Sequence, residues 1–140
     1  VLGLKDANSS ELDSEGKHPV IDILPEQEGV KDMGATMRLG DHEVIISGGK
    51  AQDLYNSNTI FERHRHRYEI NPEYISQIEE KGMKYTGRDK SGRRMEILEL
   101  ENHPYFMASQ FHPEFKSRPD NPSPLHFGLV KAALEHKKIN

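Results

Sequence analysis

The sequence of 140 residues contains no cysteine. Without a thiol the chain can form no disulfide bond, bind no zinc through thiolates and offer no cysteine nucleophile of its own. No apolar run approaches the ~20 residues that a membrane-spanning helix needs, and the first residues lack a charged leader followed by an apolar core. Neither an internal repeat nor a Gly-X-Gly-X-X-Gly phosphate-binding loop occurs. We therefore expect a soluble, cytoplasmic protein.

An excess of positive charge is also missing. The formal net charge is −4 and the isoelectric point is about 6.1, so we expect neither nucleic acid nor a membrane as a partner. The hydrophobic fraction of 34% is low for an independent domain, whereas 30% of the residues are charged. Residues 1–140 suit a single unit, and the first residue, Val1, is not methionine. We expect a segment of a longer polypeptide.

The apolar patterns and turn residues predict the α/β class. Asn71 followed by Pro72 is typical of a helix start, and Gly82 ends that helix. Residues 83–87 and 94–100 predict a hairpin, whereas residues 6–12 are small and polar and predict a loop. The other expected elements are strands over 19–24, 34–40, 43–47 and 105–110, a helical turn over 51–55, and a final helix from Pro124 whose stripe of Phe127, Val130 and Leu134 packs on the sheet.

Arginine and histidine alternate from Arg63 to Arg67. In an extended conformation Arg63, Arg65 and Arg67 share one face and the two histidines, His64 and His66, share the other. A row of guanidinium groups suits the binding of carboxylates or phosphates. A solvated edge strand is the structural alternative. The basic residues cover too small an area for a nucleic-acid site. No carboxylate cluster accompanies the two histidines, so we expect no metal site.

The segment Phe111-His112-Pro113-Glu114-Phe115 follows the apolar run 105–110. The proline stops the predicted buried strand, so His112 and Glu114 fall at its end, where α/β proteins place their chemistry. A histidine with a nearby carboxylate suits a general base and its orienting partner. The pair lacks a nucleophile to activate.

Five stretches together resemble the C-terminal part of the class I glutamine amidotransferase domain of CTP synthases. They occur in the order of that family and span nearly the whole chain: Asp6-Ala7-Asn8-Ser9-Ser10-Glu11, Gly34-Ala35-Thr36-Met37-Arg38-Leu39-Gly40, Glu62-Arg63-His64-Arg65-His66-Arg67-Tyr68-Glu69, Gln110-Phe111-His112-Pro113-Glu114-Phe115 and Phe127-Gly128-Leu129-Val130-Lys131-Ala132-Ala133.

The resemblance implies a flavodoxin-like, three-layer α/β fold of the class I glutamine amidotransferase type, of which residues 1–140 are an incomplete C-terminal portion. In that family a Cys-His-Glu triad hydrolyses L-glutamine, and the ammonia aminates ATP-activated UTP to CTP in a synthetase domain. Carried over by motif, His112 resembles the base and Glu114 its orienting carboxylate. Glu11 resembles the residue that holds the glutamine ammonium group, and Arg67 resembles a glutamine-site residue. From composition alone, a solvated loop carboxylate or a cap is favoured for Glu11 over a binding role.

The family's Gly-X-Cys-Leu-Gly-X-Gln elbow does not occur in these residues, so we expect it upstream, together with the synthetase domain. The segment alone is then inactive and needs no cofactor. Mg²⁺, ATP, UTP and the GTP effector belong to the missing portion, and the family forms homotetramers mainly through the synthetase domain. Two alternatives remain: a non-catalytic amidotransferase-like binding or regulatory module, and an anion-binding module built on Arg63, Arg65 and Arg67.

Overall fold

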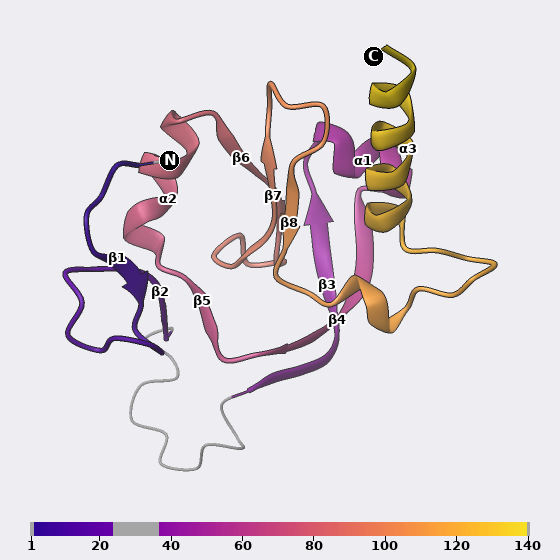
Figure 1. The fold of residues 1–140 in the computed structure, drawn as a ribbon. Coiled ribbons are helices and arrows are strands. Elements are labelled where there is room, and N and C mark those ends of the chain that lie inside the picture. The colour runs from indigo at the N-terminus through magenta and orange to yellow at the C-terminus, as the bar shows by residue number, and fades with distance from the viewer. Residues whose placement is uncertain (1, 24–36, 140) are drawn as a thin grey trace.

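The computed structural model describes residues 2–23 and 37–139. Within them the strands form two sheets, ordered β1-β2-β5 and β4-β3-β6-β7-β8. Helix α2 contacts β6, whereas α1 contacts both the larger sheet and α3 (Figure 1). The predicted α/β class is confirmed. In the described part of the chain β1 and β2 pair in parallel and the other neighbouring strands pair antiparallel.

The smaller sheet joins the N-terminal segment to the middle of the chain. Strand β1 (Ala7–Ser9) runs parallel to β2 (His18–Ile23), which pairs with β5 (Tyr68–Ile70). The predicted strand over 19–24 is confirmed, although Leu24 lies outside the described residues. The loop predicted over 6–12 is wrong for Ala7–Ser9. Pairing with β2 supplies hydrogen-bond partners that the polar sequence could not reveal.

Strand β3 (Arg38–Ile46) pairs with β4 (Thr59–His66) along nearly its whole length. Two separate strands were predicted here, but the structure has one. Gly40, where the prediction placed a break, adopts a left-handed φ of 89° and stays opposite His64 in the ladder. Residues 34–36 of the first predicted strand lie outside the described part of the chain.

Strands β6 (Met83–Arg88) and β7 (Met95–Leu100) form the predicted hairpin. The Asp89 carboxylate holds the turn by accepting hydrogen bonds from the N–H groups of Arg93 and Arg94, at 3.0 and 3.1 Å. Strand β8 (Met107–Ser109) then pairs with β7 at the edge of the sheet. The buried strand predicted over 105–110 is therefore wrong in length and in burial.

The helix predicted from Pro72 is confirmed as α2 (Pro72–Glu80). The side chain of Asn71 accepts a hydrogen bond from the N–H of Glu73, at 3.0 Å, as expected of an N-cap. The predicted helical turn is α1 (Gly49–Tyr55). Its first N–H groups have a tertiary cap, because the carboxylate of Glu99 accepts from Lys50 and Ala51 at 2.9 and 3.0 Å.

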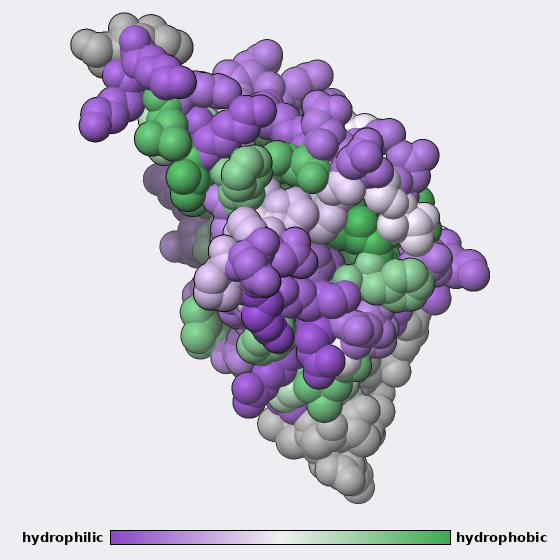
Figure 2. All heavy atoms as spheres, turned by 90° about the vertical axis from the view of Figure 1, so that its right-hand side faces the viewer, coloured by the Kyte–Doolittle hydropathy of each residue, from purple (hydrophilic) through white to green (hydrophobic). Residues whose placement is uncertain are grey.

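The final helix, α3 (Pro124–Ile139), exists as predicted but packs by a different face. Leu125 and Gly128 are buried, and the latter closely approaches Leu54 of α1. The predicted core stripe of Phe127, Val130 and Leu134 is instead more than half exposed. Figure 2 looks onto this side of the molecule and shows apolar side chains at the surface. The described residues contain nothing that covers them.

Candidate active site

A hydrogen-bonded histidine and carboxylate lie shortly after β8. His112 begins the short helix η2 (Pro113–Phe115), and its Nδ1 lies 2.7 Å from Oε1 of Glu114. Since the carboxylate occupies Nδ1, Nε2 is the nitrogen that can exchange a proton with a substrate or nucleophile. No described residue forms a hydrogen bond with Nε2, and the His112 side chain is 38% exposed. The predicted pairing is thus present in the structure.

Two neighbours fix the orientation of the His112 ring. The ring of Phe115 stacks on it, with centroids 4.9 Å apart and planes inclined by 20°. The hydrogen bond from His112 holds the pKa of Glu114 below its ordinary value. An ionised Glu114 can stabilise the imidazolium that forms when the ring accepts a proton. This arrangement suits general acid–base chemistry at Nε2.

The backbone of His112 is anchored on β4. Its N–H donates to the carbonyl oxygen of Arg63, at 2.8 Å. Along β4 the side chains of Arg63 and Arg65 are exposed whereas His64 is buried, which confirms the predicted alternation. Arg67 does not continue the row. It lies after β4 has ended at His66 and before the chain enters the smaller sheet, and it is half-buried. The prediction that Arg67 continues the row of Arg63 and Arg65 is therefore wrong.

The inward side of β4 carries an ion network that the sequence analysis did not identify. His64 Nε2 lies 2.8 Å from Oε2 of Glu96 on β7, and Arg38 Nη1 lies 2.5 Å from Oε1 of the same carboxylate. Next to it, His66 Nε2 lies 3.2 Å from Glu69 Oε1. The available signal was the presence of two glutamates, Glu96 and Glu99, among the apolar residues of β7.

Electrostatics favour an ionised Glu96. Burial opposes its ionisation, but the hydrogen bond from His64 and the charge of Arg38 outweigh burial and hold the pKa of Glu96 below its ordinary value. His64 Nδ1 also faces an acceptor, the carbonyl oxygen of Glu62, at 2.9 Å. Both ring nitrogens of His64 therefore have a hydrogen-bond partner.

The sequence matches a family model for class I glutamine amidotransferases over residues 13–132. The chain belongs to this family. Curated relatives of this amidotransferase include the CTP synthases of Archaeoglobus fulgidus, 58% identical over 139 residues, and of Methanosarcina mazei, 54% identical over 139 residues. Each alignment covers 99% of this chain and 26% of the relative. The chain thus spans about a quarter of the length of these relatives.

A solved structure confirms the fold of the amidotransferase. The glutaminase domain of Trypanosoma brucei CTP synthase, with bound acivicin, superposes with a TM-score of 0.88 at 35% identity. The alignment covers 96% of this chain and 53% of that one. The predicted class I glutamine amidotransferase fold is therefore correct.

Of the two predicted glutamine-binding residues of the amidotransferase, only Glu11 lies far from the His112–Glu114 pair, because Tyr68, next to Arg67, accepts a hydrogen bond from the side chain of Gln110 at 2.9 Å. Glu11 is exposed in the turn after β1, where its N–H donates to Ser9 Oγ at 3.2 Å. Figure 1 shows β1 and β2 on the opposite side of the molecule from η2. Arg67 lies between them along the chain, at the junction of β4 and β5. Within the described residues no hydrogen bond or ion pair joins Glu11 to His112.

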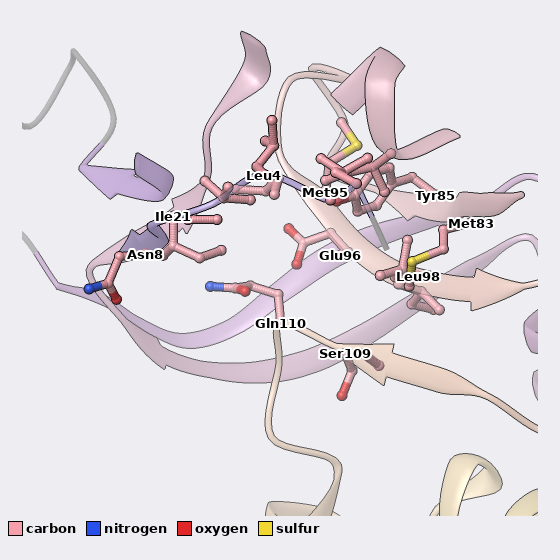
Figure 3. Close-up of a pocket in the computed structure, with 18 residues that line it drawn as sticks. Leu4, Asn8, Ile21, Met83, Tyr85, Met95, Glu96, Leu98, Ser109 and Gln110 are labelled. Atoms are coloured by element: carbon pink, nitrogen blue, oxygen red, sulfur yellow. The ribbon is translucent and has the colours of Figure 1, made fainter. Parts of the chain in front are cut away.

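A mostly apolar cavity of about 570 Å³ lies between the two sheets. Figure 3 shows Glu96 and Gln110 at its polar side, with Met83, Tyr85 and Leu98 among its apolar lining. Neither His112 nor Glu114 lines it. An open apolar cavity of this size is unusual inside one folded unit, because protein interiors are close-packed.

Two further properties concern the described residues alone. No helix among them is both long and apolar enough to cross a membrane. Their histidine and carboxylate side chains form no group of three or more that could hold a metal ion.

Proposed function

We propose that this chain is the C-terminal part of the glutaminase domain of a CTP synthase. The observation that carries the proposal is the 2.7 Å contact between His112 Nδ1 and Glu114 Oε1, with Nε2 left accessible, in a chain 58% identical to a CTP synthase. The enzyme hydrolyses L-glutamine, and the ammonia aminates UTP, activated by ATP, to give CTP.

His112 is the base and Glu114 the carboxylate that orients it. Nε2 takes the proton of a cysteine thiol supplied by the upstream portion of the domain. The thiolate attacks the amide carbon of glutamine, and His112 returns the proton to the departing ammonia, leaving a thioester. Water, deprotonated by the same nitrogen, then cleaves the thioester and releases glutamate and the thiol. Such proton transfers are worth roughly 10²–10⁴-fold in rate.

Glu11 and Arg67 bind the two charged ends of glutamine in this proposal. The Glu11 carboxylate takes the α-ammonium group, and the Arg67 guanidinium takes the α-carboxylate. Each assignment pairs groups of opposite charge. A bidentate contact between the guanidinium and the carboxylate would also fix the orientation of the substrate. The proposal requires a single glutamine molecule to reach Glu11, Arg67 and His112 at once, in a pocket that the remainder of the glutaminase domain completes.

The partners of the segment are the N-terminal portion with the nucleophile and the synthetase domain that binds UTP, ATP and Mg²⁺. The exposed apolar side chains of Phe127, Val130 and Leu134 and the open cavity support a large contact with that portion. In this proposal Mg²⁺ and ATP bind to the synthetase domain. We also propose that GTP is an effector of the enzyme and that the enzyme forms a homotetramer through the synthetase domain. Its proposed location is the cytoplasm.

The substitution His112→Ala in the complete enzyme tests the proposal. Glutamine-dependent CTP formation should fall by at least ~10²-fold, the lower range for loss of a general base. CTP formation from added ammonia should persist, because ammonia bypasses glutamine hydrolysis. Retention of full glutaminase activity would overturn the assignment, and loss of both activities would require the variant's folding to be examined by circular dichroism.

The non-catalytic alternative makes the opposite prediction. A module that only binds or regulates would leave glutamine hydrolysis unchanged in the His112→Ala variant. The accessible Nε2 of His112 disfavours this alternative, because a purely structural histidine usually has both ring nitrogens satisfied, as His64 does.

A further inference from the structure

The ring of His64 supports the chain directly before the proposed base. Phe111 is 2% exposed, and its ring packs edge-on against His64, with centroids 6.0 Å apart and planes inclined by 68°. The next residue, His112, donates its N–H to Arg63 on the same strand, at 2.8 Å. Two successive residues thus take their positions from two successive residues of β4.

Glu96 supports the same segment from the other side. The N–H of Gln110 donates to the Glu96 carbonyl oxygen at 2.9 Å, while the Glu96 carboxylate binds His64 Nε2 at 2.8 Å. Figure 3 shows the side chains of Glu96 and Gln110 beside one another. The backbone of Glu96 therefore holds residue 110, and its side chain holds the ring on which residue 111 packs.

We infer that Glu96 is a positioning residue for glutamine hydrolysis. This inference rests on the proposed function of His112 as the base. The Glu96 carboxylate, which has no exposed surface, fixes the ring of His64, and that ring fixes Phe111 and with it the direction of the His112 side chain. Glu96 touches neither His112 nor Glu114, so its effect is exerted through the chain segment 110–112.

The two donors on Glu96 make its role sensitive to a small chemical change. Oε1 accepts from Arg38 and Oε2 accepts from His64. In Glu96→Gln one of these oxygens becomes an NH₂ group, which cannot accept a hydrogen bond. One buried donor then loses its partner and must move. If His64 moves, Phe111 follows, because the two rings are in contact within a close-packed core.

The test is Glu96→Gln in the complete enzyme, with kcat and KM for glutamine measured per folded protein. We expect kcat to fall roughly 10- to 100-fold, the range that follows from a misplacement of about 1 Å. The KM for glutamine should stay within about twofold, because Glu96 is not assigned to substrate binding. An unchanged kcat in the folded variant would overturn the inference.

Glu99→Gln is the matched control. Glu99 is a buried glutamate on the same strand and also accepts several hydrogen bonds, but it caps α1 and lies away from the His112 segment. We expect a lower melting temperature and an unchanged kcat. If both variants lower kcat equally, general destabilisation explains the effect and the inference fails.

A double-substitution cycle separates this inference from the proposed function. In an enzyme that already carries His112→Ala, adding Glu96→Gln should change the residual activity no further, because Glu96 acts through His112. If His112→Ala alone leaves glutamine hydrolysis intact, the proposed function fails. If it abolishes hydrolysis while Glu96→Gln leaves kcat unchanged, only the positioning role fails.

A second variant covers the case in which Glu96→Gln does not fold. His64→Gln leaves the Arg38–Glu96 ion pair intact and keeps an N–H donor near Glu96, but it removes the ring that contacts Phe111. We expect the same fall in kcat with an unchanged KM. A folded His64→Gln variant with full kcat would contradict the inference.

Discussion

Nδ1 of His112 lies 2.7 Å from Oε1 of Glu114, although the two side chains are 38% and 54% exposed. Water competes strongly for an exposed hydrogen bond of this kind, so the pair depends on its covalent setting. Pro113 between the two residues restricts the backbone, and Phe115 supports the ring from one face. The carboxylate therefore orients the imidazole without being buried itself.

Neutralising this carboxylate should lower the rate of hydrolysis and leave glutamine binding unchanged. For Glu114→Gln in the complete enzyme we expect kcat to fall about 10²-fold, less than the ~10⁴-fold seen when a buried orienting carboxylate of a serine protease is neutralised. Steady-state assays of glutamate release measure this kcat. Glu114→Asp, which keeps the charge, should recover part of the loss. Equal kcat values for the Glu114→Gln variant and the wild type would contradict the proposal that Glu114 orients His112.

Removing the charge of Glu11 should affect binding and leave the chemical step intact. In Glu11→Gln the KM for glutamine should rise by roughly tenfold to a hundredfold, because a hydrogen bond between charged groups contributes about 1.5–3 kcal/mol. The kcat should stay within a few-fold of wild type. Glu15→Gln, in the same exposed N-terminal loop, is the control and should leave KM unchanged. A KM unaffected by Glu11→Gln would remove Glu11 from the binding site.

Glu62 should make the enzyme less stable as the pH rises. Burial raises the pKa of Glu62, in spite of the hydrogen bond from Tyr55, and its Oε2 has no partner among the described residues. A carboxyl group whose pKa is raised by folding binds more protons in the folded state, so stability falls as pH increases through that pKa.

The substitution Glu62→Gln tests this pH dependence. The variant should be more stable than wild type at neutral pH, by about 1 kcal/mol, since the substitution removes a buried charge whose Oε2 has no partner among the described residues. The difference should shrink as the pH is lowered toward the range in which Glu62 is protonated. Melting temperatures of both proteins, measured across a series of pH values, provide the test. A gap that widens on acidification would show that the pKa is not raised.

Gly49→Ala should be strongly destabilising. Gly49 has a φ of 72°, and an added Cβ would lie 2.6 Å from Glu99 Oε1 and 2.8 Å from Thr86 Cγ2. Left-handed strain contributes about 1 kcal/mol for a non-glycine residue, and the close contacts add to it. Gly92→Ala is the control, because Gly92 has a similar φ of 74° but open space around it. Thermal unfolding should show a larger fall in melting temperature for Gly49→Ala than for Gly92→Ala. Equal falls would mean that the side chains of Glu99 and Thr86 move aside at little cost.

Local signals predicted the elements whose determinants are adjacent in sequence. Asn71 and Pro72 define the start of α2, and the apolar patterns flanking Asp89 define the β6–β7 hairpin. The His112–Glu114 pair was also predictable, because only Pro113 separates the two residues. Each of these features depends on backbone and side-chain chemistry within a few residues, which the sequence displays directly.

Contacts between distant segments decided the features that local signals did not predict. β1 is a strand because β2 lies beside it, and α3 presents an unexpected face because Gly128 lets the helix approach Leu54. The partner of His64 is Glu96, 32 positions away, and no periodicity links the two. The sequence by itself determined the α/β class, the alternation along β4 and the proposed base with its carboxylate. Only the tertiary structure decided which buried charges meet, because pairing across a sheet depends on strand order and register, which distant parts of the chain set together.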